Sequence, residues 1–264
     1  MKLCRFIHES YRLSSYGAIE GEVVRQAPLD KLWGEAFEND WHHERKEIPL
    51  AEVKLVAPAE PSKIVCVGRN YREHAAELGN PMPLEPLLFL KAPSSIIGPD
   101  DAIELPPESK QVEHEGELGV VIGRRARKLH ADDDPLRYVL GYTCLNDVTA
   151  RDLQRKDVQF TRGKSFDTFC PIGPLIETDI SPLDLNVVTR VNGEVKQQGR
   201  TSHMAFPVPM LIRYISHIMT LYPGDVIATG TPAGVSSLSA GDTVEVEVEG
   251  IGVLRNSVIE SKEQ

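Results

Sequence analysis

The chain has 264 residues, of which 41% are hydrophobic and 26% are charged. These ordinary globular values exclude a mostly disordered, a collagen-like and a disulfide-framework protein. Its 39 acidic residues outnumber its 29 basic residues and give a net charge of −10. This balance argues against nucleic acid as a partner, because phosphate binding requires clustered lysines and arginines.

The sequence predicts a cytoplasmic protein that is not embedded in a membrane. The N-terminal segment lacks the continuous apolar core of a signal peptide, and no window approaches the ~18 apolar residues of a spanning helix. Four cysteines are present, and none forms a C-x-x-C pair. Cys66 and Cys144 lie in apolar runs, so we expect buried and reduced thiols.

Two prolines mark a boundary at the end of the first 57 residues, in the sequence Ala-Pro-Ala-Glu-Pro over 57–61. We expect a small β-containing N-terminal module over residues 1–57 and the main domain over residues 58–264. Within the module, the pattern predicts a short hairpin from Lys2–Ile7 and Tyr16–Glu20, and a short helix over Pro28–Glu38.

Short strands dominate the predicted main domain. Apolar or β-branched runs bounded by Gly or Pro predict most of them. Asn192-Gly193 predicts a tight hairpin turn, and alternating valines and glutamates predict a half-buried strand over Thr243–Glu249. The predicted strands and hairpin arms are Lys63–Gly68, Leu87–Lys91, Gly116–Gly123, Gly141–Leu145, Val187–Lys196, Val226–Gly230, Thr243–Glu249 and Gly252–Ile259.

Predicted helices are few and short. They cover Tyr71–Leu78, Pro135–Leu140, Thr149–Asp157 and Pro207–Thr220. Because helices and strands do not alternate regularly, a doubly wound parallel sheet is not expected. The elements predict an α+β fold that is dominated by β structure and has short peripheral helices.

Three acidic residues are candidate metal ligands. Glu115 and Glu117 stand two positions apart before an apolar strand, so they share one face. Asp147 ends another apolar strand. The alternatives are a solvated strand edge for the glutamates and a turn or N-cap role for the aspartate. An oxygen-only set favours Mg²⁺ or Mn²⁺, with Ca²⁺ as a further alternative, over Zn²⁺.

Other segments carry candidate catalytic groups. His74 and Glu77 stand three residues apart on a predicted helix, where the carboxylate can orient the imidazole as a general base. The alternative is an exposed helical pair. Lys164, which precedes a predicted proline-marked loop over Cys170–Pro174, can stabilise an enolate, or it is a surface lysine. Thr229–Gly234 can bring backbone N–H groups close to an anion, or it is only a tight turn.

In this order, the segments resemble the fumarylacetoacetate hydrolase family. The matching segments are VGRNYREHAAE, EPLLFLKAPSSIIGP, VEHEGELGVVIG, GYTCLNDVTARDLQ, RGKSFDTFCPIGP, VNGEVKQQGRTSHM and LYPGDVIATGTPAGV. The N-terminal module resembles that of bacterial 2-hydroxyhepta-2,4-diene-1,7-dioate isomerases. The resemblance implies the mixed β-roll or barrel of this family, a homodimer and a divalent metal, with Mg²⁺ as our prediction and Mn²⁺ or Ca²⁺ as alternatives.

The resemblance also assigns roles to individual residues. The metal ligands are Glu115, Glu117 and Asp147, and the catalytic residues are Lys164, His74 and Glu77. The candidate substrate-binding residues are Arg69, Arg151, Gln154 and Thr231. The implied substrate is a small 2-oxo or 2-hydroxy-2-ene acid whose two neighbouring oxygens chelate the metal.

Such an acid reaches several products through one enolate. Reprotonation at another carbon is isomerisation, loss of CO₂ is decarboxylation, and attack by water that His74 activates is C–C hydrolysis. We predict the isomerase in aromatic-acid breakdown. The alternatives are an acylpyruvate hydrolase of the fumarylpyruvate type, an oxaloacetate decarboxylase and, as a minor reading, a non-catalytic metal-stabilised binding module.

Overall fold

Strands make up most of the regular structure in this computed structural model, which describes residues 1–9, 14–27 and 46–261. The predicted helix over Pro28–Glu38 lies outside these residues. The strands are β1 (Lys2–Ile7), β2 (Ser15–Glu20), β3 (Val23–Ala27), β4 (Glu47–Pro49), β5 (Lys54–Val56), β6 (Ile64–Gly68), β7 (Leu87–Lys91), β8 (Ile96–Ile97), β9 (Ala102–Leu105), β10 (Val112–Glu113), β11 (Gly116–Ile122), β12 (Val139–Asn146), β13 (Thr149–Ala150), β14 (Cys170–Glu177), β15 (Asn186–Val191), β16 (Glu194–Arg200), β17 (Val226–Ala228), β18 (Thr243–Val248) and β19 (Gly252–Glu260).

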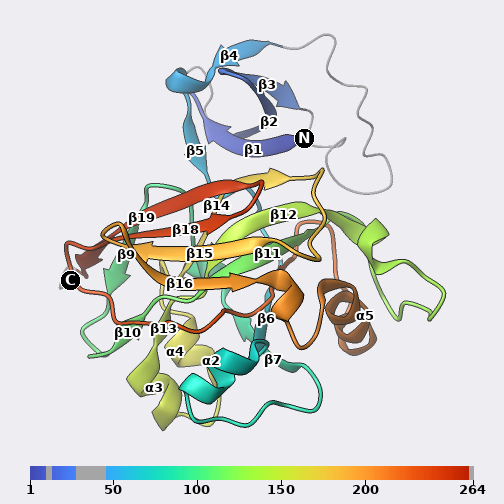
Figure 1. Cartoon of the computed structure of the whole chain (residues 1–264). Helices are drawn as coiled ribbons and strands as arrows, with labels where there is room; N and C mark the ends of the chain where they lie inside the picture. Colours follow the sequence, from blue (N-terminus) through green and yellow to red (C-terminus); the bar gives the residue numbers. More distant parts are fainter. Residues whose placement is uncertain (10–13, 28–45, 262–264) are drawn as a thin grey trace.

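The helices are short, as predicted. The α-helices are α2 (Arg72–Glu77), α3 (Arg151–Lys156), α4 (Thr161–Lys164) and α5 (Val208–Ile218), and the 3₁₀ turns are η2 (Leu50–Glu52), η3 (Pro93–Ser95), η4 (Pro135–Tyr138) and η5 (Thr201–His203). Figure 1 shows α2, α3 and α4 gathered at one end of the molecule and β1 to β4 at the opposite end. Within the described residues, no helix is both long enough and apolar enough to span a bilayer.

The larger sheet contains strands from both the N-terminal segment and the main domain. Its main path is β4-β3-β2-β1-β14-β12-β11-β17-β6-β7. β1 joins the N-terminal strands to the rest, since it pairs antiparallel with β14 in the register Lys2 to Glu177. The N-terminal strands therefore extend the sheet that also contains β11, which carries Glu117, and β12, which Asp147 follows.

A second sheet of five strands, in the order β16-β15-β18-β19-β9, lies against the first (Figure 1). The hairpin turn predicted at Asn192-Gly193 joins β15 to β16. Asn192 and Gly193 have φ of 53° and 80°, the left-handed pair that a two-residue hairpin turn requires. β18 alternates as predicted, with Val244, Val246 and Val248 buried.

The main core fills the space between the two sheets and α5. Val120, Val187 and Val246 come from three different strands of this core, and Ile212 comes from α5. Burying such side chains is the dominant favourable contribution to folding, at about 1.5–3 kcal/mol each. The outcome is a β-dominated α+β fold, which confirms the predicted fold class.

Three local predictions need correction. Pro135–Leu140 does not form an α-helix: one 3₁₀ turn ends at Tyr138 and strand β12 begins at the next residue. The proline-marked segment Cys170–Pro174, read as a loop, begins strand β14 and contains a cis Gly173–Pro174 bond. The predicted helix Thr149–Asp157 begins only at Arg151, because Thr149 pairs in a two-residue strand with Glu113.

Candidate metal centre and active site

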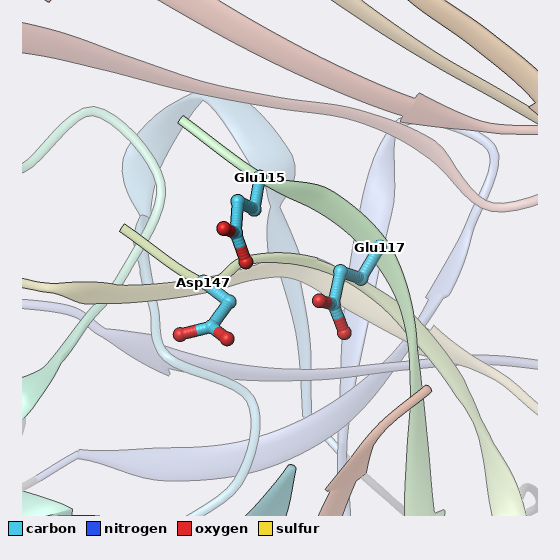
Figure 2. Close-up of side chains that lie close together, drawn as sticks. All are labelled: Glu115, Glu117 and Asp147. Atoms are coloured by element: carbon cyan, nitrogen blue, oxygen red, sulfur yellow. The ribbon is translucent and has the colours of Figure 1, made fainter. Parts of the chain in front are cut away.

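The pairing of β11 with β12 brings the three candidate metal ligands together. Gly116 is opposite Asn146 in this antiparallel pair. The Asp147 N–H donates to the Glu115 carbonyl over 2.8 Å, and the Glu115 N–H donates to Asn146 Oδ1 over 2.9 Å. The ligand oxygens of Glu115, Glu117 and Asp147 all lie within 4.8 Å of one another, and Figure 2 shows their carboxylates converging.

These carboxylates are buried, which is inconsistent with a solvated strand edge. At most 5% of each residue's surface is exposed. Removing an ion from water costs several kcal/mol unless opposite charge and hydrogen bonds compensate it. The cluster therefore requires positive charge, and the surrounding side chains supply it.

Two lysines supply part of this charge. Lys164 Nζ lies 2.7 Å from Glu115 Oε2 and 2.6 Å from Asp147 Oδ2. Lys91 Nζ lies 2.7 Å from Asp147 Oδ1 and donates to the Val148 carbonyl over 3.0 Å. Both lysines are 2% exposed, so Lys164 is not a surface lysine. Burial opposes its charge, but Asp147 and Glu115 outweigh burial and raise the Lys164 pKa.

Arg151 supplies the third positive charge. Its Nη2 pairs with Glu115 Oε1, and its Nε donates to Glu113 Oε2 over 2.8 Å. Its Nη1 donates to Gln154 Oε1 over 2.6 Å, which leaves the Gln154 amide nitrogen as a donor for other groups. Gln111 Nε2 completes the arrangement by donating to Glu113 Oε1 over 2.7 Å.

Glu117 differs from Glu115 and Asp147 in its contacts, and from Glu115 in its pKa. Its carboxylate forms no ion pair within the described part of the chain, and the one hydrogen bond that this carboxylate accepts there is from the Gly230 N–H to Oε2, at 2.7 Å. Burial raises the Glu117 pKa, and the negative charges of Asp147 and Glu115 raise it further. In contrast, Lys164 and Arg151 overcome burial and hold the Glu115 pKa well below its ordinary value.

The donor set fits one hard divalent cation. It consists of three carboxylates, the ligands that Mg²⁺, Mn²⁺ and Ca²⁺ prefer, and contains no thiolate or imidazole. The cation would add positive charge beside Glu117, the carboxylate that forms no ion pair within the described residues. The residues that would hold it are Glu115, Glu117 and Asp147.

The raised Glu117 pKa predicts that metal binding releases a proton. A raised pKa keeps the acid protonated to higher pH, and a cation binds the ionised form, so apparent Mn²⁺ affinity should rise with pH until Glu117 is ionised. Calorimetric titration with Mn²⁺ at one pH, in buffers of different ionisation enthalpy, measures this proton. A binding heat that is the same in every buffer would contradict the prediction.

His74 and Glu77 lie together on α2, as their spacing predicts. The His74 Nδ1 lies 3.2 Å from Glu77 Oε2. The other oxygen, Oε1, accepts a 3.0 Å hydrogen bond from the Gly234 N–H. Glu77 is therefore held from two sides and can fix the ring so that Nε2 is the basic nitrogen. His74 is only 5% exposed, so the pair is not simply a surface contact.

Nearly all the predicted site residues line one cavity of about 450 Å³. Among its lining residues are nine of the ten predicted site residues: Arg69, His74, Glu115, Glu117, Asp147, Arg151, Gln154, Lys164 and Thr231. Glu77 does not line it but contacts His74, which does. Phe89 and Phe160 form an aromatic wall, with ring centroids 5.5 Å apart, and Lys164 Nζ lies 5.1 Å from the Phe89 centroid.

Arg69 is one of two cations lining the cavity, with Arg155, that form no ion pair within the described residues. It follows β6 with φ of 57°, a conformation that costs a non-glycine residue free energy and clusters at functional sites. Lys164 and Arg151 are both committed to carboxylates. Within the described residues, Arg69 forms no ion pair, so its guanidinium remains available to an anion in the cavity.

Sequence reasoning missed several residues of this site. Lys91 ends an apolar strand, and nothing in its sequence context distinguishes it from an exposed lysine. Glu113 did carry a signal, because it continues the alternation of Glu115 and Glu117, but its pairing with Arg151 requires the fold. The N-cap alternative for Asp147 is wrong: Ala150 occupies the N-cap of α3 without a side-chain bond.

Two family models match the chain. The model described as fumarylacetoacetate (FAA) hydrolase C-terminal matches residues 63–259, and the model described as Rv2993c-like, N-terminal matches residues 1–58. The two matched segments do not overlap, and β1 of the first pairs with β14 of the second.

Named relatives carry different activities. The structure of a 2-hydroxyhepta-2,4-diene-1,7-dioate isomerase from Mycobacterium marinum is 42% identical, with a TM-score of 0.88 and all of both chains covered. Human oxaloacetate tautomerase FAHD2A, mitochondrial, is 46% identical over 80% of this chain and 71% of its own.

A third relative is described with a metal. A maleylpyruvate hydrolase from Sphingobium, in complex with manganese(II) and pyruvate, is 30% identical with a TM-score of 0.80, covering 99% of this chain and all of its own. The shared fold, the convergent carboxylates and the match over 63–259 together establish that this chain belongs to the fumarylacetoacetate hydrolase family.

Proposed function

We propose that this chain is a divalent-metal-dependent isomerase of 2-hydroxyhepta-2,4-diene-1,7-dioate in aromatic-acid breakdown. The observation that carries this proposal is the convergence of three buried carboxylates with Lys164 in one cavity. The whole-length similarity to the isomerase from Mycobacterium marinum supports this reaction among those of the family.

We propose Mg²⁺ as the metal, with Mn²⁺ and Ca²⁺ as alternatives, held by Glu115, Glu117 and Asp147. When bound, such a cation supplies a Lewis acid that polarises the 2-oxo group and carboxylate of the substrate. The manganese and pyruvate in the maleylpyruvate hydrolase structure support a cation of this class.

The protein groups around the cavity then have distinct roles. Lys164 would place its ammonium beside the negative charge that develops as the substrate becomes an enolate. Gln154 would donate from its free amide nitrogen, because Arg151 occupies its oxygen. Arg151 would chiefly hold Glu115 in place, and Thr231 would contact the substrate. Isomerisation follows when the enolate takes its proton back at a different carbon.

Arg69 would bind the second carboxylate of a dicarboxylic substrate. We expect Arg69→Gln to raise the KM for the dienedioate about 10-fold or more, since hydrogen bonds to charged groups contribute about 1.5–3 kcal/mol. Steady-state assays of a dicarboxylate and a monocarboxylate substrate measure this, with Arg72→Gln, on the exposed face of α2, as the control. Equal losses for both substrates would argue against this role.

The second candidate is hydrolysis of an acylpyruvate of the fumarylpyruvate type, and the 3.2 Å contact between His74 and Glu77 favours it. His74, oriented by Glu77, would take a proton from the water that attacks the remote carbonyl. Oxaloacetate is a further candidate substrate. Decarboxylation and tautomerisation both proceed through an enolate, and the human relative is named as a tautomerase.

His74→Ala separates these chemistries. We expect the substitution to reduce acylpyruvate hydrolysis by about 10²–10⁴-fold, the usual contribution of a general base. Reactions that need only the enolate should persist. The measurement is turnover on each substrate with Mg²⁺, with the exposed His203→Ala as the control. Undiminished hydrolysis would show that His74 is not the base.

The direct test of the proposed function is product identification. Purified protein with Mg²⁺ is offered the 2-hydroxydienedioate, an acylpyruvate and oxaloacetate, and the products are resolved by NMR. We expect the isomerised dienedioate as the main product. If the protein converts only the acylpyruvate or only oxaloacetate, the isomerase proposal is wrong and the function is the reaction on that substrate. Metal-dependent melting without turnover on any substrate would favour the non-catalytic binding module.

Three further properties are proposed: the compartment, the oligomeric state and the domain division. The four cysteines are buried and unpaired, which supports a reducing compartment such as the cytoplasm. The homodimer remains an expectation from the family resemblance, and the division into residues 1–57 and 58–264 remains an expectation from the proline-marked boundary.

A further inference from the structure

Gln197 links the five-stranded sheet to the candidate site. It lies on β16 with no exposed surface. Its side chain forms four hydrogen bonds, with the Gly116 N–H at 3.0 Å, His114 Nδ1 at 3.1 Å, Thr231 Oγ1 at 2.7 Å and the Pro232 carbonyl at 2.7 Å. All the groups it contacts belong to the segments that carry Glu115, Glu117 and Thr231.

The backbone contacts fix the orientation of this amide. A backbone N–H can only donate, so Gln197 Oε1 faces Gly116, and a carbonyl can only accept, so Nε2 faces Pro232. The second N–H of Nε2 must then point to Thr231. Each of the four bonds of Gln197 has a defined direction, and none remains for solvent or ligand.

This orientation determines the Thr231 hydroxyl. Because Thr231 Oγ1 accepts from Gln197, its own proton donates to the Gly116 carbonyl, 2.8 Å away. Thr231 also lines the cavity. It therefore offers the cavity a lone pair, and its partner there is a hydrogen-bond donor such as a ligand hydroxyl group or a water molecule.

Close backbone contact strengthens the link between the sheets. A Cβ on Gly116 would lie 2.0 Å from Thr189 Oγ1 on β15, and a Cβ on Gly234 would lie 2.0 Å from the Lys196 carbonyl on β16. Gly234 also has φ of 103°, which favours glycine. The Thr229–Gly234 turn and the start of β11 thus rest directly on the β15–β16 hairpin.

We propose that Gln197 is a positioning residue of this site, which sets the orientation of the Thr231 hydroxyl and its contact with the Glu115–Glu117 segment. The proposal depends on the proposed function only for its kinetic readout. Gln197 does not line the cavity, so it would act on a ligand entirely through Thr231.

The kinetic test uses Gln197→Glu, which keeps an acceptor for Gly116 and His114 but loses both donors. We expect KM to rise about 3- to 10-fold, the effect of one hydrogen bond, with kcat changed less than KM. Gln198→Glu introduces the same charge one residue away on the exposed face of β16 and should leave KM unchanged.

A double-substitution cycle then separates positioning from general damage. In a Thr231→Ala background, Gln197→Glu should raise KM no further, because its route of action is already removed. Fully additive effects, or an unchanged KM in Gln197→Glu alone, would overturn the proposal.

A crystallographic test needs no turnover. In crystals of Gln197→Glu, or of Gln197→Met should the first variant fail to fold, we expect Thr231 Oγ1 to leave the Gly116 carbonyl; in Gln198→Glu it should remain. An unmoved Thr231 would overturn the proposal whatever the activity. If Thr231 moves but the wild-type protein turns over none of the substrates, the proposed function fails and the positioning role stands.

Discussion

Glu117→Gln is expected to weaken Mn²⁺ binding by more than about 100-fold while leaving the metal-free fold intact. Altering even an indirect supporting group costs about 10–100-fold in metal affinity, so loss of a ligand should exceed this. Glu117 has a raised pKa and a single Gly230 partner. A neutral amide should therefore replace its protonated form with little loss of stability. Thermal melts with and without Mn²⁺ and direct Mn²⁺ titration measure both properties.

Two matched variants complete this experiment. Glu104→Gln, on an exposed position of β9, should change neither the Mn²⁺ affinity nor the stability of the metal-free protein. Glu115→Gln should also weaken Mn²⁺ binding, but it leaves Lys164 and Arg151 facing a neutral group and should destabilise the metal-free protein by about 3–5 kcal/mol. A Glu117→Gln protein that still gains stability from Mn²⁺ like the wild type would refute a ligand role for Glu117.

Lys164→Met should lower turnover by about 10²–10³-fold, the effect of removing one donor that stabilises an oxyanion. The same change removes the counter-charge between Glu115 and Asp147. The metal-free protein should therefore lose stability, whereas the increase in Tm on adding Mn²⁺ should become larger. Steady-state kinetics and paired melting curves test the two effects separately.

The control for this variant is Lys156→Met, which changes an exposed lysine at the end of α3. It should affect neither turnover nor the Mn²⁺ response. If Lys164→Met retains nearly wild-type turnover, the lysine serves only to balance the buried carboxylates, and the enolate must be stabilised by other groups.

Local patterns predicted much of this fold. The alternating valines of β18, the Asn192-Gly193 turn and the apolar runs that became β6, β7 and β11 depend on neighbouring residues, which a sequence displays directly. Proline misled the prediction twice. At η4 a proline starts only a 3₁₀ turn before a strand, and in β14 Pro171 and Pro174 lie inside a strand, where proline is usually a sign of a loop.

The residues of the site could be predicted from the sequence, but most of the ion pairs and hydrogen bonds between them could not. The spacing of Glu115 and Glu117 and the family motifs predicted the candidate metal ligands, whose carboxylates do lie together. The groups that contact these carboxylates and the backbone between them come from distant segments: Lys91 contacts Asp147 across 56 positions, and Gln197 contacts Gly116 across 81. Such contacts depend on the pairing of whole strands, and one sequence alone does not reveal this pairing.

The most direct test of the central claim is a crystal structure with Mn²⁺ and pyruvate, using anomalous scattering to locate the metal. We predict one manganese peak, bound by oxygens of Glu115, Glu117 and Asp147, with the keto and carboxylate oxygens of pyruvate completing its coordination. A cavity that holds no manganese at saturating concentration, or manganese bound only elsewhere, would contradict the account.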